Sequence, residues 1–375
     1  MNLGEILNKI LQSLPDFYWG SLVMIVVGII LIYLAIVKEY EPVLLLPIGF
    51  GCILANLGMA ATANGDNFLS VLYRAGIQTE LFPLLIFVGV GGMIDFSPLL
   101  AQPKMVLLGA AGQFGIYGTL VLATLLNFNL HQAAAIGVIG AIDGPTAIFV
   151  AGKLAPELLA PIAVAAYSYM SLIPIIQPPI MKLLTTRKER LIRMEYSPRS
   201  VSKTARIIFP VAVTIIVSLL APQAAPLIAA LMLGNFLKEA GVVERLNKSA
   251  QNEIINISTL FLGLTIGATM TAQNFLRLDT LMILGLGLLA FILDTVAGLL
   301  FGKLMAFLSG GKINPLIGAC GISAFPMAGR LSAKMAQDED FENFILMHAM
   351  GSNTAGQLAS VIAGGLLLTL VTVIK

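Results

Sequence analysis

Charged residues are scarce in this chain of 375 residues: Asp, Glu, Lys and Arg together make up 11%, whereas hydrophobic residues make up 58%. Soluble globular domains carry about 25% charged residues. A chain with less than half of that charge has too few polar side chains to cover a soluble fold of this size. The composition therefore excludes a soluble globular protein and predicts a polytopic membrane protein.

Cysteine and histidine are also rare, with two of each. Cys52 and Cys320 lie in apolar segments without a Cys-x-x-Cys spacing, and His131 and His348 stand apart from each other. This distribution disfavours a disulfide framework and a transition-metal centre. We expect both cysteines to be small core residues.

The chain is rich in long hydrophobic runs. A bilayer core about 30 Å thick is crossed by about 20 apolar residues, and suitable runs occur at 20–37, 43–63, 104–126, 158–181, 207–220, 224–237, 279–307 and 344–374. Between them lie shorter pieces rich in Gly, Pro and small polar residues, at 81–97, 133–153, 257–273 and 313–333. Their length and their helix breakers predict re-entrant hairpins or discontinuous helices.

The N-terminus and the central loop indicate how the chain meets the membrane. Over residues 1–19, leucines and isoleucines recur at helical spacing and are followed by Phe17, Tyr18 and Trp19, which predicts an interfacial amphipathic helix with an aromatic anchor. Basic residues gather around the connecting loop at 183–206, within which only Glu189 and Glu195 are acidic. By the positive-inside rule this loop is cytoplasmic.

Asp143 lies inside an apolar run, Ala134–Val150, that is long enough to enter a bilayer. A charge at that depth costs about 2.5–3.5 kcal/mol on insertion scales, and such residues are usually functional. The next residues, Gly144 and Pro145, break a helix and free backbone carbonyls beside the carboxylate. Membrane proteins build cation sites in this way. We therefore predict that Asp143 binds and moves an ion, and we rank Asp95, Asp279 and Asp294 below it because none adjoins a Gly-Pro break.

The chain contains an internal repeat. Gly140–Ala155 reads GAIDGPTAIFVAGKLA and Ile317–Ser332 reads IGACGISAFPMAGRLS, and the two align with Gly144 on Gly321. Upstream, Gly89 aligns with Gly263 in nearly the same register. Chance similarity between Gly- and Ala-rich segments is the alternative explanation for either match alone.

The repeat divides the chain into two membrane halves, 20–182 and 207–375, with hairpins at 133–153 and 313–333. If each half crosses the membrane an odd number of times, the repeats are inverted and the two hairpins face each other near the midplane. We therefore expect an all-α polytopic membrane protein with two inverted repeats, broken helices and an elevator-like arrangement of scaffold and core.

Oxygen-bearing side chains gather around the second hairpin, namely Asn314, Ser323 and Asn353. Sodium is a hard cation that prefers oxygen ligands, as calcium and magnesium do. The alternative for each of these residues is an ordinary interhelical hydrogen bond, worth about 0.6 kcal/mol on average. Arg330 is suited to holding a carboxylate in a bidentate way, although it could also extend to the membrane surface. Tyr169 could relay a proton or belong to an interfacial aromatic belt.

Four motifs together resemble a known family: GAIDGPT at 140–146, AYSYM at 166–170, the stretch from Asn314 to Arg330, and GSNTAG at 351–356. They are similar to the membrane β subunit of biotin-dependent, sodium-pumping decarboxylases, which act in oxaloacetate, methylmalonyl-CoA, glutaconyl-CoA and malonate systems. The resemblance covers nearly the whole chain in order. The short N-terminus is more similar to the acyl-CoA branch than to the oxaloacetate branch.

The resemblance implies that this subunit decarboxylates carboxybiotin in the cell inner (cytoplasmic) membrane while Na⁺ is exported and a proton is consumed. Biotin would be carried on a separate carrier subunit, and a carboxyltransferase α subunit, a small membrane anchor subunit and further copies of this chain would complete the assembly. The site residues that it implies are Asp143, Asn314, Ser323 and Asn353 for Na⁺ and protons, Gly318 packed closely at the same sodium site, Tyr169 on the proton path, and Arg330 for carboxybiotin.

A Na⁺-coupled secondary transporter of a small carboxylate is the alternative function. It would use the same inverted repeats, with Arg330 holding the transported substrate. Both functions need a cation site, so Asp143 does not separate them. A protein partner does, because only the decarboxylase subunit has to receive a biotin carrier.

Overall fold

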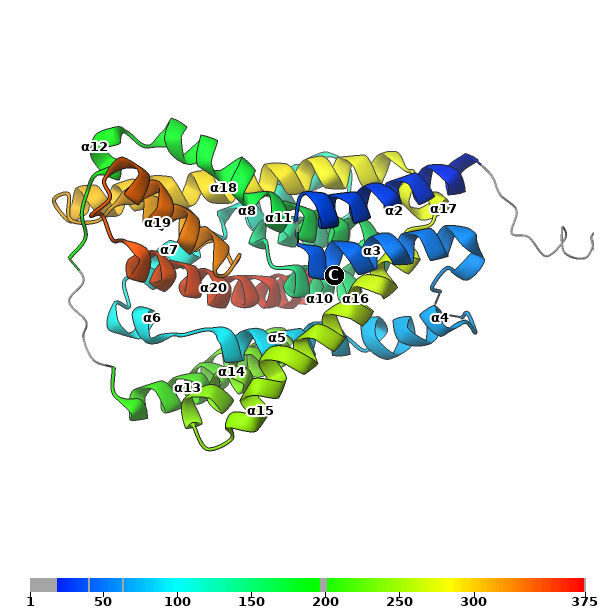
Figure 1. Ribbon diagram of the computed structural model, residues 1–375, viewed down its shortest axis with the longest axis horizontal. Helices are drawn as coiled ribbons and strands as arrows, with labels where there is room; N and C mark the ends of the chain where they lie inside the picture. The colour runs from blue at the N-terminus through cyan, green and yellow to red at the C-terminus, as the bar shows by residue number, and fades with distance from the viewer. Residues whose placement is uncertain (1–18, 40, 63, 196–200, 374–375) are drawn as a thin grey trace, which may run out of the picture. The chain divides into compact units, whose positions relative to one another are not determined.

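The computed structural model describes residues 19–39, 41–62, 64–195 and 201–373. Within these residues every regular element is a helix (Figure 1), which confirms the all-α prediction. The interfacial helix predicted over 1–19 lies outside the described residues, apart from its last residue.

The first half of the chain forms a series of helices that ends at the basic loop. Several are interrupted by π- or 3₁₀-helical turns (η), which mark local changes of direction. They are α2 (Trp19–Val37), α3 (Pro42–Leu54), η1 (Ala55–Met59), α4 (Phe68–Leu72), η2 (Tyr73–Gln78), α5 (Leu81–Met93), α6 (Ser97–Ala101), α7 (Met105–Ala111), α8 (Phe114–Leu125), α9 (Leu130–Gly137), η3 (Val138–Ala141), α10 (Gly144–Leu154), η4 (Pro156–Leu158), α11 (Leu159–Leu184) and α12 (Arg187–Arg190).

The second half has a similar series of elements with some longer helices. They are α13 (Lys203–Leu220), η5 (Pro222–Ala224), α14 (Ala225–Ala240), α15 (Glu244–Ser249), η6 (Ala250–Ile254), α16 (Ile255–Thr269), α17 (Ala272–Phe275), α18 (Leu278–Leu308), η7 (Pro315–Gly321), α19 (Met327–Glu339) and α20 (Leu346–Val373). The predicted breaks at 133–153 and 313–333 are both present, between η3 and α10 and between η7 and α19.

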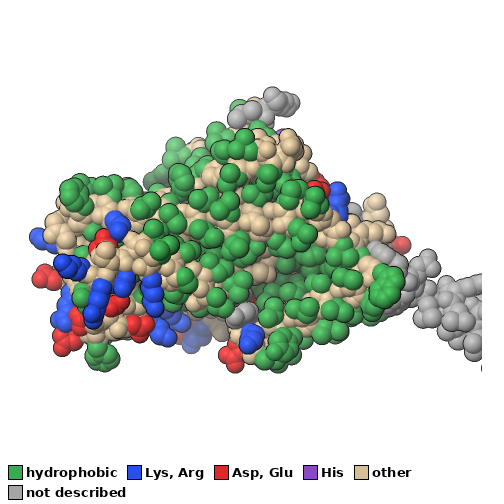
Figure 2. All heavy atoms as spheres, turned by 90° about the horizontal axis from the view of Figure 1, so that it is seen from above, with side chains coloured by type: hydrophobic (Ala, Val, Ile, Leu, Met, Phe, Trp, Pro, Cys, Tyr) green, Lys and Arg blue, Asp and Glu red, His purple; other side chains and the backbone are tan. Residues whose placement is uncertain are grey.

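Six helices among the described residues are long and apolar enough to cross a membrane, and two bent pairs raise the number to as many as eight. One bend, of 62°, separates Pro156–Met170 from Leu172–Leu184. Pro174 explains it, because its ring meets the carbonyl of Met170 four residues earlier and removes one helical hydrogen bond. Figure 2 shows hydrophobic side chains over most of one face, with Lys, Arg, Asp and Glu gathered mainly at one end.

Contacts divide the chain into two compact units. The first combines Met1–Phe82 with Thr259–Leu281, and the second combines Pro83–Ser258 with Met282–Lys375. Each unit therefore joins segments from both halves of the sequence. Both cysteines are fully buried and free, in agreement with their predicted role as core residues.

Within the first unit, α3 packs closely on α16. A Cβ atom added to Gly51 would lie 2.2 Å from the carbonyl oxygen of Leu264, so only glycine permits this approach. Asn56, which is 6% exposed, donates from its amide to the carbonyl oxygen of Met270 at 2.8 Å and accepts from the N–H of Ala272 at 3.2 Å. One amide thus satisfies the backbone where α16 ends.

Within the second unit, α14 packs on α5 in the same manner. A Cβ atom on Gly234 would lie 1.9 Å from the carbonyl oxygen of Val88. The amide of Asn235, which is 1% exposed, donates to the carbonyl oxygens of Gly91 at 3.4 Å and Ile94 at 3.0 Å, where α5 ends. Asn56 and Asn235 therefore have the same role in the two halves of the sequence, and each binds the helix end of the opposite half.

Candidate functional site

Asp143 lies where the helix of the first hairpin breaks. The 3₁₀ turn η3 ends at Ala141, Ile142 adopts a left-handed conformation with φ 52° and ψ 44°, and Asp143 then caps the N-terminus of α10. Pro145 is accommodated in the first turn of α10, where a missing N–H is tolerated. The break predicted from Gly144 and Pro145 is therefore present, and it places a carboxylate at a helix N-terminus.

The Asp143 side chain is 5% exposed and is held mainly through one oxygen. Oδ2 accepts hydrogen bonds from the Thr146 hydroxyl at 2.7 Å, from the Gln357 amide at 2.9 Å and from the Ser360 hydroxyl at 3.0 Å. Oδ1 accepts from the backbone N–H of Thr146 at 3.5 Å. Figure 1 shows α10 beside α20, the helix that carries Gln357 and Ser360.

These contacts leave Asp143 without a compensating charge. No Lys or Arg of the described residues forms an ion pair with it, so its charge is balanced only by neutral donors. A buried carboxylate of this kind favours binding a proton or a metal cation. Thr146, Ser360 and Gln357 each carry an oxygen that can turn toward a cation when the donor role is not needed.

Ser323, in the segment between η7 and α19, contacts the end of η3. The Ser323 hydroxyl donates to the carbonyl oxygen of Ala141, and the Ser323 N–H approaches the same oxygen at 3.3 Å. Because Ala141 lies two residues before Asp143, Ser323 touches the break that positions the carboxylate. An apolar cluster that includes Ile142 and Ile322 packs behind this contact.

Three amide side chains bind the carbonyl groups at the end of η7. Gln177 donates to Ala319 O at 2.8 Å, Asn353 donates to Cys320 O at 3.2 Å and Ile322 O at 2.8 Å, and Gln113 donates to Gly321 O at 3.1 Å. All three side chains are at most 2% exposed, and their amide oxygens have no partner among the described residues. This region therefore offers buried oxygen atoms of the type that an alkali cation binds.

Gly318 lies within η7, and Asn314 lies directly before it. A Cβ atom on Gly318 would lie 2.1 Å from the carbonyl oxygen of Gly298 in α18, so the two backbones are in direct contact. Asn314 caps η7 by accepting from Leu316 N at 3.0 Å, and its amide donates to backbone carbonyls of the basic loop. The structure does not bring the Asn314 side chain into the hydrogen-bond shell of Asp143.

Tyr169 and Arg330 also lie away from the Asp143 shell. The Tyr169 hydroxyl donates to the carbonyl oxygen of Leu284 in α18, and its ring packs against the apolar cluster that contains Ile142. Arg330 is exposed, one turn into α19, and forms no ion pair with the described residues. Its guanidinium is therefore available to an anionic ligand.

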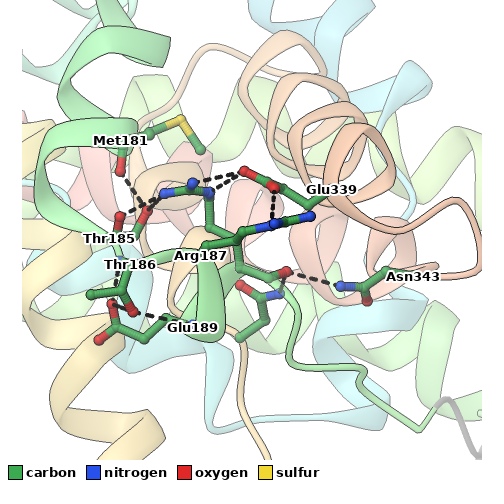
Figure 3. Close-up of polar contacts among 9 residues, drawn as sticks. Met181, Thr185, Thr186, Arg187, Glu189, Glu339 and Asn343 are labelled. Atoms are coloured by element: carbon green, nitrogen blue, oxygen red, sulfur yellow. Dashed lines mark hydrogen bonds and ion pairs between the residues drawn. The ribbon is translucent and has the colours of Figure 1, made fainter.

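The basic loop contacts Asn314, which precedes η7, and residues at and after the end of α19, as Figure 3 shows for Arg187, Glu339 and Asn343. Arg190 lies 2.7 Å and Arg187 3.2 Å from carboxylate oxygens of Glu339. The amides of Asn314 and Asn343 both donate to the carbonyl oxygen of Arg190 at 3.0 Å. We call this set of contacts between 186–192 and these three residues (Asn314, Glu339, Asn343) the loop latch. It pairs two basic side chains of the loop with an acidic residue from outside the loop, which itself contains few acidic residues.

Removing Arg190 should loosen the loop latch. Arg190→Ala leaves Thr185 O without its charged donor and leaves Glu339 with only the exposed Arg187, so we expect amide hydrogen exchange over 186–192 to rise roughly tenfold. Lys188→Ala, at an exposed position of the same short helix, should leave exchange unchanged. Equal exchange in the two variants would contradict the latch.

Acid should have the same effect as the Arg190 substitution. Hydrogen bonds from Arg190 and Arg193 lower the pKa of the Glu339 and Asp340 carboxyls below their ordinary values of 4.5 and 3.8. A lowered folded-state pKa means that the stabilisation is complete above the ordinary value and is lost as the pH falls through the folded value. Exchange over 186–192, corrected for its intrinsic pH dependence, should therefore stay constant at neutral pH and rise only in strongly acidic buffer.

Gln357, Ser360, Gln113 and Gln177 are site residues that the sequence reasoning missed. A signal for two of them exists, because Asn353, Gln357 and Ser360 recur at spacings of four and three residues on one face of α20. Gln113 and Gln177 each lie alone among apolar residues. An amide side chain within an apolar span was therefore the only feature of the sequence that could have indicated either of them as a site residue.

The chain is similar to proteins of known activity along nearly its whole length. A family model described as the Na⁺-transporting oxaloacetate decarboxylase beta subunit matches residues 20–371. Glutaconyl-CoA decarboxylase subunit beta of Acidaminococcus fermentans is 52% identical over 355 residues, which cover 95% of this chain and 94% of the relative. Methylmalonyl-CoA decarboxylase subunit beta of Veillonella parvula is 52% identical over 356 residues, with the same shares covered. The oxaloacetate decarboxylase beta chain of Klebsiella pneumoniae is 47% identical over 427 residues, covering 97% of this chain and 98% of the relative.

Proposed function

Because the chain belongs to the family of Na⁺-transporting oxaloacetate decarboxylase β subunits, we propose that it decarboxylates carboxybiotin and couples this reaction to Na⁺ export. It is a β subunit of a Na⁺-transporting decarboxylase, one part of a multi-subunit complex, and a multi-pass protein of the inner membrane. The comparisons do not support the alternative of a secondary carboxylate transporter. The observation that carries the proposal is the match over 20–371, together with a buried Asp143 that has no basic partner among the described residues.

The proposed coupling follows from the charge at Asp143. Loss of CO₂ breaks the N–C bond of carboxybiotin, and the ureido nitrogen that remains takes up one proton. Asp143 binds either a proton or Na⁺, so Na⁺ that enters from the cytoplasm displaces a proton, which the reaction consumes. One cation always neutralises the carboxylate in its apolar surroundings. Moving one charge against 100 mV requires about 2.3 kcal/mol, which decarboxylation can supply.

The remaining site residues are assigned around this step. Ser323 and Asn353 belong to the sodium site, and Gly318 allows the close packing that holds it. Tyr169 joins the proton path through α18, and the exposed Arg330 receives the carboxylate of carboxybiotin. Asn314 connects the basic loop to η7. We therefore assign it two roles, in Na⁺ binding and in the shape of the cytoplasmic entrance.

Inverted repeats are the architecture that we propose for alternating access. The paired contacts of Asn56 and Asn235, each at the helix end of the opposite half, support this arrangement. Such paired contacts are expected when two similar halves face each other and each half packs on helices of the other. In this arrangement the two hairpins belong to a moving, elevator-like core, and the outer helices form the scaffold.

An acyl-CoA is the substrate class that we propose for the whole complex. The glutaconyl-CoA and methylmalonyl-CoA relatives are 50–52% identical to this chain, whereas the oxaloacetate relatives are 45–47% identical. The higher identity favours the acyl-CoA relatives. The proposed partners are a biotin carrier, a carboxyltransferase α subunit, a small membrane anchor subunit and further copies of this chain.

Purification through a tag on this chain tests the proposal. A biotin-bearing subunit that is detected with avidin should copurify, and the complex in proteoliposomes should accumulate Na⁺ only when glutaconyl-CoA or methylmalonyl-CoA is present. Free avidin should block both decarboxylation and Na⁺ uptake. Na⁺-driven uptake of a free carboxylate, without any biotinylated subunit, would instead identify a secondary transporter.

A further inference from the structure

A second acid is buried in the membrane-spanning part of the protein. Asp294 lies in the middle of α18 and is 0% exposed. The other charged residues of that helix, Asp279 and Lys303, lie about 22 Å and about 14 Å away along the helix axis. Asp294 therefore has no charged neighbour on its own helix.

The two carboxylate oxygens of Asp294 have different surroundings. Oδ1 accepts a hydrogen bond from the backbone N–H of Gly115 in α8. Oδ2 has no partner among the described residues and faces η3, since a Cβ atom on Gly140 would lie 3.1 Å from it. No Lys or Arg of the described residues forms an ion pair with Asp294. One oxygen is thus directed, without a partner, at the break of the first hairpin.

A proton suits this site better than Na⁺. An ionised carboxyl with one hydrogen bond and no counter-charge is strongly disfavoured in an apolar interior, so Asp294 needs a neutralising cation. Sodium requires several oxygen ligands, yet Gly115 presents an N–H and Gly140 has no side chain. Asp143, in contrast, is surrounded by side chains that carry oxygen.

Asp294 also lies between the parts that the proposed mechanism requires to move. One turn further along α18, Gly298 contacts Gly318 of the second hairpin, and nearly two turns earlier Gly287 contacts Tyr169. Gly140, on the other side of the Oδ2 atom, is three residues before Asp143. The titratable groups on the elements that these contacts bring against α18 are Tyr117 of α8, Tyr169 of α11 and Cys320 of η7, together with Asp143, which follows η3.

We propose that Asp294 is a proton-carrying acid of the pump, separate from Asp143, which takes up and releases one proton at the first hairpin in each turnover. Uptake forms an O–H bond on the free Oδ2. Release breaks it and passes the proton to the first hairpin, where it replaces the proton that Na⁺ displaces from Asp143 and that decarboxylation consumes, one per CO₂. Asp294 is restored in every cycle, so it carries the proton without being consumed. This inference rests on the function proposed above.

The decisive variant is Asp294→Asn in the complete complex, reconstituted in proteoliposomes. Asn keeps the shape and the acceptor for Gly115 but holds no exchangeable acid proton, so decarboxylation and Na⁺ uptake should fall at least about 100-fold, as for loss of a proton-transfer group. Asp279→Asn, at the partly exposed start of the same helix, should behave as wild type. Wild-type rates in Asp294→Asn would show that Asp294 is a neutral structural residue and would overturn the proposal.

An infrared measurement keeps the proposal testable if Asp294→Asn does not fold. In Asp143→Asn protein labelled with ¹³C-aspartate, one protonated aspartic acid band should remain, exchange in D₂O and disappear on alkaline titration. A carboxylate that stays ionised, or one that protonates only when Na⁺ is withdrawn, would contradict the proton assignment. If the wild-type complex itself fails to couple decarboxylation to Na⁺ uptake, the proposed function fails, whereas a working pump with a normal Asp294→Asn variant refutes only this inference.

Discussion

Asp143→Asn should abolish both decarboxylation and Na⁺ transport, with rates at least about 100-fold below wild type. The substitution keeps the size of the side chain but removes the charge that alternately binds Na⁺ and a proton. It also replaces one acceptor oxygen by a donor NH₂ group, which must face either Thr146 N or the three donors at Oδ2. Coupled assays of CO₂ release and ²²Na⁺ uptake in proteoliposomes would measure the two losses together.

Ser360→Ala is the graded control for this prediction. It removes one donor to the carboxylate while keeping the charge, so we expect about a tenfold weaker apparent Na⁺ affinity with turnover at saturating Na⁺ largely retained. Sodium uptake that persists in Asp143→Asn would remove the role assigned to this carboxylate. Identical losses in the two variants would indicate a structural effect in place of ion binding.

Gly298→Ala should destabilise the protein and inactivate it. The new methyl group would lie 2.3 Å from the carbonyl oxygen of Gly318, and neither atom belongs to a flexible side chain that could turn away. Overpacking of this kind costs about 1–3 kcal/mol. Separation of α18 from η7 would also displace the carbonyl groups that Gln177 and Asn353 bind. Thermal unfolding in detergent and Na⁺ uptake should therefore both decline.

Gly285→Ala is the matched control on the same helix. A Cβ atom at this position would meet nothing within 4 Å, so the substitution changes only the backbone entropy. It should stabilise α18 by about 0.5–1 kcal/mol and leave activity unchanged. If both alanine variants unfold alike, close contact between Gly298 and Gly318 is not what holds the second hairpin in place.

Composition and local breakers were sufficient to predict much of the fold. Apolar runs such as 279–307 correspond to single helices because a span of about 20 apolar residues has few alternatives in a bilayer. The Gly144-Pro145 break was predictable for a local reason, the missing N–H of proline. The motifs also identified the family, which the comparisons confirm.

The contact of Asp143 with its partners on α20 could not be predicted from the sequence in the same way. Gln357 and Ser360 lie near the opposite end of the chain, and nothing local to either segment records that α10 and α20 are neighbours. Asn314 illustrates the opposite problem. Its residue type fits a cation site, yet its amide binds carbonyls of the basic loop, because only the folded chain places Arg190 O beside it. The roles assigned to the site residues remain predictions.

The contacts of Asn56 and Asn235 with helix ends of the opposite half have a consequence for dividing the chain into two fragments. Each asparagine binds carbonyl groups at the end of a helix from the other half, so a fragment containing one half alone would leave those carbonyl groups without the amide donor. Two fragments produced together could complement each other, whereas either one alone should be degraded.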